Sequence, residues 1–199
     1  MKVKQEKKLP IFIRDTREHK GHGFRWNKSK NWGSMETTKL ECGDYSIKGY
    51  EQDFVIERKG SASELIKNLI TVDKERFHRE LEILSTCKAA WIICEFDMKD
   101  LEKALRFINK GRGWGAKVKR KLSMEHVSGA IASINCKYKI PIIFASNNEY
   151  AKKLSQKSIY WLAMAAESEM LPKRLMAAFM YYWIPKMMQK LAGYALGKF

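Results

Sequence analysis

The chain has 199 residues, enough for one domain with an appendage, and its hydrophobic fraction of 45% is that of a globular protein rather than a disordered one. A formal net charge of +16 is typical of a protein that binds a polyanion, with nucleic acid as the first candidate and an anionic membrane surface as the second. No apolar run reaches transmembrane length, and the charged residues 1–9 lack the apolar core of a secretion signal, so we expect a cytoplasmic protein with a disordered basic N-terminus.

The first half of the chain predicts three strands and two helices. A strand over 11–13 leads into Asp15 and a Gly-rich basic stretch that is typical of a functional loop. Strands over 37–45 and 53–57 are expected to pair as a hairpin through a turn at 48–50. From Ser61 the apolar spacing becomes helical, and a second helix carries Phe77 and Leu81.

The second half continues this alternation of strands and helices. The apolar run 89–96 is typical of a strand covered on both faces, and we expect it in the middle of the sheet. Residues 103–121 are basic, contain glycine and lack acids, which predicts a flexible basic loop. A helix over 124–138, a buried strand over 140–145 and a helix from 149 follow. The order predicts an α/β fold with a mixed central sheet flanked by helices.

The last segment, residues 166–199, differs in composition from the rest. From Leu171 it has no acidic residue and mixes methionine, aromatic and lysine side chains, while Pro185 would break or kink any helix there. One interpretation is a terminal helix that packs on the domain or on a second subunit. The alternative is a helix that binds a membrane surface or a partner.

Two carboxylates and a lysine lie close together around the predicted hairpin. Side chains alternate along a strand, so Glu57 and Lys59 point to one face, and an antiparallel neighbour would bring Asp44 beside Glu57. Two acids held together repel each other unless a cation such as Mg²⁺ or Mn²⁺ separates them. Asp15, at the end of the first strand, is a candidate third carboxylate.

This set of residues contains the parts of a metal-dependent phosphodiesterase. A bound divalent ion can polarise a phosphodiester and lower the pKa of a water, and Lys59 can orient that water or neutralise charge in the transition state. The bare spacing also arises by chance, and surface ion pairs on a hairpin are the alternative interpretation.

The order of these motifs resembles the nuclease domain of the XPF family of structure-specific endonucleases, a branch of the PD-(D/E)xK superfamily. Its G-D motif matches Gly43 and Asp44, and its E-R-K motif matches residues 57–59. Its D-x-R-E motif matches Asp15, Arg17 and Glu18, and later motifs match 76–77, 129–133 and 140–144.

The resemblance implies a restriction-endonuclease-like nuclease domain over residues 10–165, followed by a helical tail over 166–199. It implies metal binding by Asp44 and Glu57, with help from Asp15 and a backbone carbonyl near Arg58. It also implies that Lys59 is the catalytic lysine and that the D-x-R-E motif, with Arg17 and Glu18, joins the catalytic set.

The function implied by the resemblance is a Mg²⁺- or Mn²⁺-dependent DNA endonuclease, a homodimer that acts on branched or junction DNA in repair, recombination or replication. The length leaves no room for the helix-hairpin-helix modules of many cellular members, so we expect a stand-alone domain like those in phage and bacterial genomes. The alternative is a catalytically silent, nuclease-like DNA-binding subunit. The intact set of Asp44, Glu57 and Lys59 argues against it.

Two basic segments are candidate DNA-binding regions. The tryptophans of the first would either stack on unpaired bases or pack against the core. The second would attract the phosphate backbone, with a solvated surface as the alternative. The candidate residues are Arg25, Trp26, Lys28 and Lys30 in the first segment and Arg112, Lys117, Lys119, Arg120 and Lys121 in the second.

Overall fold

The computed structural model describes residues 9–18, 21–28, 32–71, 73–118 and 121–167. The chain divides into a unit that ends at Tyr160 and a second unit that begins at Trp161, of which residues 161–167 are described as the end of the helix Asn148–Glu167. In the described residues, no helix is both long and apolar enough to span a membrane. The interpretations of the tail concern residues that lie almost entirely outside the described ranges.

Six strands form one mixed sheet in the order β2-β1-β3-β4-β5-β6. β1 pairs with β2 in parallel and with β3 in antiparallel orientation, β3 and β4 are antiparallel, and β4, β5 and β6 are parallel to one another. The described strands are β1 (Phe12–Asp15), β2 (Met35–Thr38), β3 (Tyr45–Ile47), β4 (Phe54–Lys59), β5 (Ala89–Cys94) and β6 (Ile142–Phe144).

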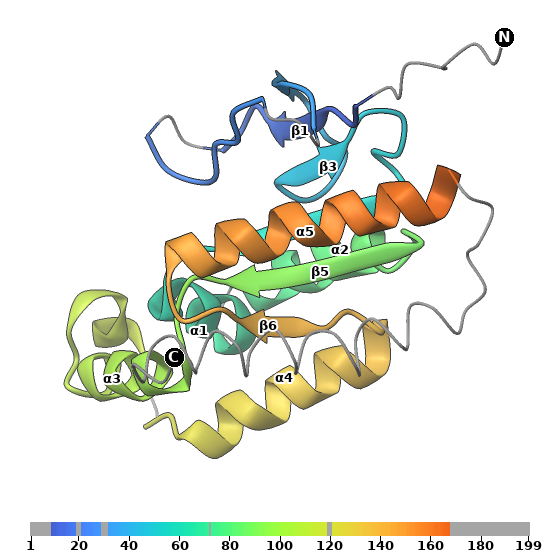
Figure 1. Ribbon diagram of the computed structural model, residues 1–199. Coiled ribbons are helices and arrows are strands. Elements are labelled where there is room, and N and C mark those ends of the chain that lie inside the picture. Colours follow the sequence, from blue (N-terminus) through green and yellow to red (C-terminus); the bar gives the residue numbers. More distant parts are fainter. Residues whose placement is uncertain (1–8, 19–20, 29–31, 72, 119–120, 168–199) are drawn as a thin grey trace, which may run out of the picture. The chain divides into compact units, whose positions relative to one another are not determined.

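Helices cover the sheet on both sides, which confirms the predicted α/β class. Figure 1 shows α5 running in front of β5 and α2 behind it. Val55 and Ile92 pack in one hydrophobic cluster with the buried residues of the first four helices, whereas the buried residues of α5 are not part of that cluster. The helices are α1 (Ala62–Ile70), α2 (Lys74–Leu84), α3 (Met98–Asn109), α4 (Met124–Tyr138) and α5 (Asn148–Glu167), with a short 3-10 helix η1 (Gly113–Lys117).

Local sequence signals explain where several helices begin. Ser61 caps α1, because its hydroxyl accepts a hydrogen bond from the backbone N–H of Glu64. Asp97 caps α3 in a reciprocal capping box, and Ser123 does the same for α4. The predicted helix over 124–138 is confirmed as α4, and the helix predicted from 149 begins at Asn148.

Three predictions from the sequence are wrong in detail. The strand predicted over 37–45 is two strands, β2 and β3, because Gly43 has a φ of +70° and the chain turns before Asp44. The run 89–96 forms β5 between β4 and β6, one strand from the edge rather than in the middle. The loop predicted over 103–121 begins as helix, since Leu101, Leu105 and Ile108 form the buried stripe of α3.

Candidate active site

The antiparallel pairing of β3 and β4 brings Asp44 beside Glu57. Tyr45 pairs with Ile56, so the next pair outward in the register is Asp44 with Glu57. The backbone N–H of Asp44 donates to the carbonyl of Ile56 at 2.9 Å, and the Oδ2 of Asp44 accepts the backbone N–H of Arg58 at 2.7 Å. Asp44 is therefore fixed to β4 through both its main chain and its carboxylate.

Gly43 allows this close approach of β3 to β4. A Cβ at this position would overlap Cγ1 of Val55 and lie 3.2 Å from the carbonyl oxygen of Ile56. Its φ of +70° is also one that side-chain-bearing residues rarely adopt. The glycine of the G-D motif is thus required by the geometry that places Asp44.

Lys59 is a buried ammonium group at the end of β4. The residue is only 4% exposed, and its Nζ lies 2.8 Å from Oε1 of Glu57 and 3.7 Å from Oε1 of Glu64. The same nitrogen lies 4.8 Å from the centroid of the Phe77 ring. Burial lowers the pKa of Lys59, but the charge and hydrogen bond of Glu57 outweigh it, so the pKa is raised and the group is protonated at neutral pH.

The carboxyl group of Asp44 has a pKa well above its usual range. Burial is the largest cause and the nearby negative charge of Glu57 is the second, while the hydrogen bond from Arg58 opposes them. Within the described residues, Oδ1 of Asp44 and Oε2 of Glu57 accept no hydrogen bond, so both retain lone pairs for a ligand. Two crowded oxygen donors fit a hard divalent cation, which would relieve their repulsion.

Among the described residues, Asp44 and Glu57 have no third acidic, histidine or cysteine ligand beside them. Across the ranges that the structure describes, no group of three or more His, Cys, Asp or Glu side chains is placed to hold a metal ion. A cation here would be bound by Asp44 and Glu57, by backbone carbonyl groups and by water. That composition is usual for Mg²⁺, which keeps several waters.

Asp15 is not available as the third ligand that the sequence suggests. Its Oδ1 accepts the backbone N–H and the Nε–H of Arg17, both at 2.7 Å. Its Oδ2 accepts the backbone N–H of Leu40 at 2.6 Å and Nη2–H of Arg17 at 3.3 Å. Burial raises the pKa of Asp15, but these hydrogen bonds outweigh it and lower the pKa overall. Four donors fill the lone pairs of this carboxylate, so Asp15 holds Arg17 and the backbone at Leu40 in place.

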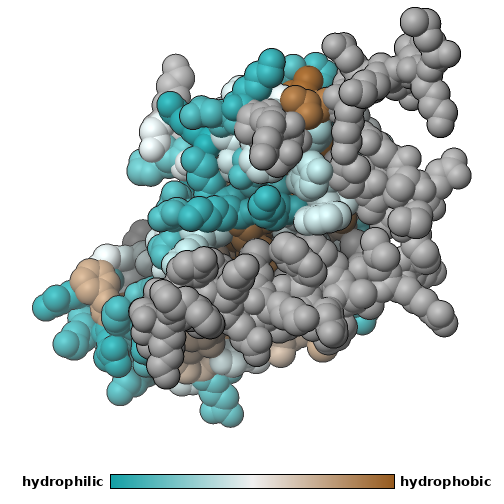
Figure 2. Space-filling model, in the orientation of Figure 1, coloured by the Kyte–Doolittle hydropathy of each residue, from teal (hydrophilic) through white to brown (hydrophobic). Residues whose placement is uncertain are grey.

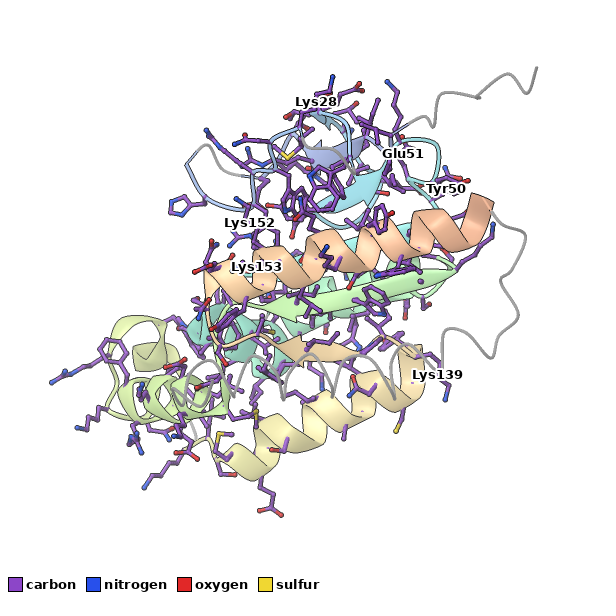
Figure 3. The ribbon with its side chains drawn as sticks, in the orientation of Figure 1. Lys28, Tyr50, Glu51, Lys139, Lys152 and Lys153 are labelled. Atoms are coloured by element: carbon purple, nitrogen blue, oxygen red, sulfur yellow. The ribbon has the colours of Figure 1, made fainter. Side chains whose placement is uncertain are left out.

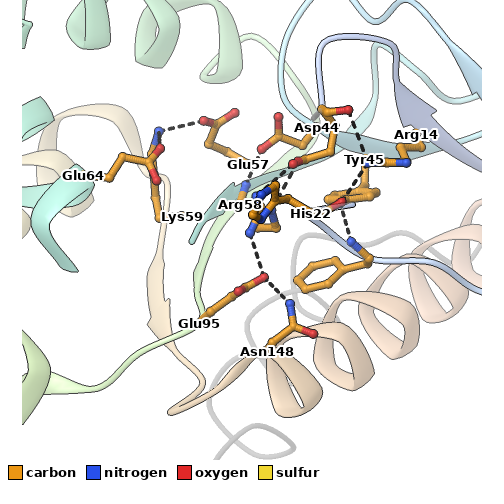
Figure 4. A network of polar contacts seen from close by, with 12 residues as sticks. Arg14, His22, Asp44, Tyr45, Glu57, Arg58, Lys59, Glu64, Glu95 and Asn148 are labelled. Carbon is orange, nitrogen blue, oxygen red and sulfur yellow. Dashed lines mark hydrogen bonds and ion pairs between the residues drawn. The ribbon is translucent and has the colours of Figure 1, made fainter. Parts of the chain in front are cut away.

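Arg58 points to the opposite face of β4 and forms a network of ion pairs (Figure 4). It makes a bidentate pair with Glu18, at 2.8 Å and 3.2 Å, and its Nη1 lies 2.9 Å from Oε1 of Glu95. Asn148, at the start of α5, donates to the same oxygen of Glu95 at 2.7 Å. Burial lowers the pKa of Arg58, but the hydrogen bonds of Glu18 and Glu95 raise it overall. Glu18 therefore stabilises the position of Arg58 on β4.

Arg17 is the residue of the D-x-R-E motif that faces the two acids. Its hydrogen bond with Asp15 is the largest cause of its raised pKa, and the charges of Asp44 and Glu57 add to it. Its side chain is 59% exposed, so it can also reach a ligand at the surface.

Glu95 and Asn148 are site-supporting residues that the sequence analysis missed. Glu95 directly follows β5, and polar residues at the ends of sheet strands are a known signal for functional positions. Asn148 carries no comparable local signal, because only the tertiary fold brings the start of α5 to Glu95.

The first basic segment does not expose Trp26. This residue is 4% exposed and packs against Phe12, Phe24 and Tyr45 with ring centroids 4.7–5.7 Å apart. The suggestion that it stacks on DNA bases is therefore wrong, and the alternative of core packing is confirmed. Trp32 is half-buried, and its ring centroid lies 6.1 Å from that of Phe12. The Nζ of Lys157 lies over the Trp32 ring.

The charged members of both basic segments are at the surface where the structure describes them. Arg25 and Lys28 are exposed, and Lys28 lies near β1 in Figure 3. Arg112 and Lys121 are also exposed. Lys30, Lys119 and Arg120 lie outside the described residues, and the side chain of Lys117 is not described.

Fold and site together define an α/β domain of nuclease type, with two acids and a lysine on neighbouring strands of a mixed sheet. The sequence matches the family model of the ERCC4 domain over residues 14–156, and the chain belongs to this family. Membership supports a nuclease or DNA-binding role, and nucleases of this family generally depend on a divalent metal.

Solved structures similar to this chain include XPF from Aeropyrum pernix, both alone and in a complex with DNA. Both are 15% identical to it, with TM-scores of 0.48 and 0.49. The similarity covers 75% and 79% of this chain but 59% and 66% of those chains, so this chain spans less than two thirds of either one. No curated protein sequence matches.

Proposed function

We propose that this chain is a Mg²⁺- or Mn²⁺-dependent endonuclease that hydrolyses phosphodiester bonds in branched or junction DNA during repair, recombination or replication. The observation that carries the proposal is the juxtaposition of Asp44, Glu57 and Lys59, two crowded acids beside a buried ammonium group. Membership in the ERCC4 family and a net charge of +16 support DNA as the substrate.

Each side chain of the site then has a defined role. Asp44 and Glu57, with a backbone carbonyl near Arg58, would hold the cation, which would polarise the phosphodiester and lower the pKa of a bound water. Lys59 is protonated, so it does not serve as the general base; its ammonium group orients the attacking oxygen and stabilises negative charge on the phosphoryl group. Arg17 reaches from the rim and binds the scissile phosphate.

A cleavage assay on defined DNAs tests this proposal. Labelled single-stranded, duplex, flap, fork and four-way-junction DNAs are incubated with Mg²⁺, Mn²⁺ or EDTA. We expect cleavage that EDTA abolishes and that both Asp44→Ala and Lys59→Ala lose. Glu36→Gln is the matched control, because Glu36 is an exposed acid paired with the exposed Lys48, and it should cut at the wild-type rate.

Absence of cleavage by the wild type, combined with tight and salt-sensitive DNA binding, would refute the enzymatic proposal. That result would favour the catalytically silent DNA-binding subunit. A homodimer, as the resemblance implies, and a cytoplasmic location stay predictions; sedimentation of the purified chain measures the first and imaging of a tagged chain the second.

A further inference from the structure

The outward face of α3 exposes a large aromatic side chain. α3 buries Leu101, Leu105 and Ile108, so position 107 lies on the opposite side of the helix, where Phe107 is 49% exposed. A single exposed apolar residue is common on protein surfaces and has no meaning alone. Phe107 differs because an arginine and several exposed basic side chains lie around it.

Arg112 lies over this ring in a cation–π arrangement. Its guanidinium carbon lies 5.8 Å from the centroid of the Phe107 ring. The chain folds back there through Gly111 and Gly113, whose φ values of +71° and +57° belong to the left-handed region. An aromatic ring and a planar guanidinium group are the two kinds of side chain on which nucleic-acid bases stack, and here both lie close together at the surface.

The segment that carries Arg112 is held in place at both ends. Asn109 makes two hydrogen bonds to the main chain of Leu122, at 2.7 Å and 2.9 Å, which close the base of the segment. The indole N–H of Trp114 donates to Oγ of Ser63 at 2.9 Å. The surface formed by residues 107–114, named here the α3–η1 corner, is therefore preorganised and would lose little conformational entropy on binding.

Positive charge surrounds this corner. Residues 103–121 contain no Asp or Glu. In the described part of the chain, no ion pair engages Lys110, Arg112 or Lys121. In Figure 2, hydrophilic side chains surround an isolated hydrophobic one over α3. Basic side chains interleaved with an exposed aromatic fit a single strand of nucleic acid, whose phosphates and bases both need partners. The basic side chains here that the structure describes as exposed are Lys110, Arg112 and Lys121, together with Lys103 and Arg106, which pair with Asp100 and Glu102 of the same helix.

The α3–η1 corner is attached directly to the candidate active site. Ser63, the partner of Trp114, lies in the first turn of α1, which begins shortly after Lys59. Its neighbour Glu64 has its Oε1 3.7 Å from the ammonium nitrogen of Lys59. The first turn of α1 therefore contacts both the α3–η1 corner, through Ser63, and the candidate active site, through Glu64.

We propose that Phe107 and Arg112 form a stacking platform for an unpaired base of a DNA strand whose phosphates contact the surrounding lysine and arginine side chains. The inference rests on the proposed function and deepens it, because it assigns a single-stranded segment of the substrate to the α3–η1 corner. Duplex DNA, whose bases are already stacked, gains nothing from this platform.

Equilibrium binding in EDTA tests the platform without any cleavage. The probes are a fluorescent oligo(dT) strand, a duplex of the same length and an abasic strand of the same length and charge. We expect Phe107→Ala to weaken oligo(dT) binding about tenfold, the loss of one stacked base, and to leave duplex and abasic-strand binding unchanged. Phe107→Trp should retain wild-type affinity. Met98→Ala is the matched control, because Met98 is on the same helix and 41% exposed.

Several outcomes would overturn the platform. An equal loss on the abasic strand would reduce Phe107 to a general structural role, and a loss no larger than that of Met98→Ala would remove it from the interface. Loss of self-association in Phe107→Ala, seen by sedimentation, would instead assign the residue to contact between copies of the chain. Wild-type cleavage in Mg²⁺ with binding that does not depend on Phe107 would overturn this inference alone, whereas Phe107-dependent binding without cleavage would refute only the endonuclease.

Discussion

The substitution Asp15→Asn tests whether Asp15 has a structural role that differs from the proposed metal binding by Asp44 and Glu57. Asp15 ends β1 and Asp44 directly precedes its antiparallel neighbour β3, so both acids lie at the same end of the two strands, and the sequence analysis considers both as metal ligands. In the structure, four hydrogen bonds occupy the carboxylate of Asp15, while Asp44 keeps an oxygen that accepts none within the described residues. We expect Asp15→Asn to lower stability and to leave metal affinity nearly unchanged.

The size of the effect follows from the partners of Asp15. Leu40 is 2% exposed, so its N–H, which donates to Oδ2 at 2.6 Å, cannot find water when an amide N–H₂ replaces that oxygen. An unsatisfied buried donor of this kind costs about 1–3 kcal/mol. The side chain of Arg17 is 59% exposed, so its ion pair with Asp15 contributes only about 0–1 kcal/mol. Together the free energy of unfolding should fall by roughly 1–4 kcal/mol.

Urea unfolding at pH 7 measures the stability, and calorimetric titration with Mn²⁺ at a temperature where the variant is folded measures the metal affinity. Asp44→Asn is the companion variant, and it should lose more affinity than the roughly 10- to 100-fold that changes to supporting residues cost. Glu36→Gln, an exposed acid outside the site, controls for lost negative charge. If Asp15→Asn lost metal affinity as strongly as Asp44→Asn while unfolding at the wild-type urea concentration, the assignment of Asp15 to the scaffold would be wrong.

Three further predictions test the rest of the arrangement. Trp26→Ala should lower the free energy of unfolding by about 3–5 kcal/mol, because it empties a buried site in the core; unchanged urea unfolding would contradict the burial. Gly43→Ala should lower the cleavage rate and metal affinity together, since its Cβ would overlap Val55 and displace Asp44, and wild-type metal affinity would contradict this. The metal-free protein should lose stability as pH rises from about 4 through the raised pKa of Asp44, because the unfolded chain releases that proton first; Asp44→Asn should flatten this slope in thermal unfolding.

The fold was predictable where the apolar residues of a segment repeat with the spacing of one type of secondary structure. The helix over 124–138 follows from apolar spacing, and the structure begins and ends α4 at the predicted residues, with Ser123 as the cap that the structure adds. The strand predicted over 37–45 was wrong because β-type composition does not show where the chain must turn. Only the tertiary contact of Gly43 with Val55 makes that turn necessary.

The candidate site was predictable along β4 and less so elsewhere. Alternation in a strand and the antiparallel register are enough to place Asp44, Glu57 and Lys59 together. The hydrogen bonds that occupy Asp15 involve Leu40, which is remote in sequence. Trp26 has the sequence surroundings of an exposed loop residue, and only the aromatic cluster around it shows that it is buried.

The structure also gives a physical reason for an arginine between the glutamate and the lysine of β4. Alternation places Glu57 and Lys59 on the face of Asp44 and sends Arg58 to the other face, where it pairs with Glu18 and Glu95. The same residue donates its backbone N–H to Oδ2 of Asp44 at 2.7 Å. The buried ion pairs on one face therefore fix the main chain that orients a carboxylate on the other. Loss of these pairs should reduce catalysis even though none of them touches the substrate, because the geometry of Asp44 depends on the position of Arg58.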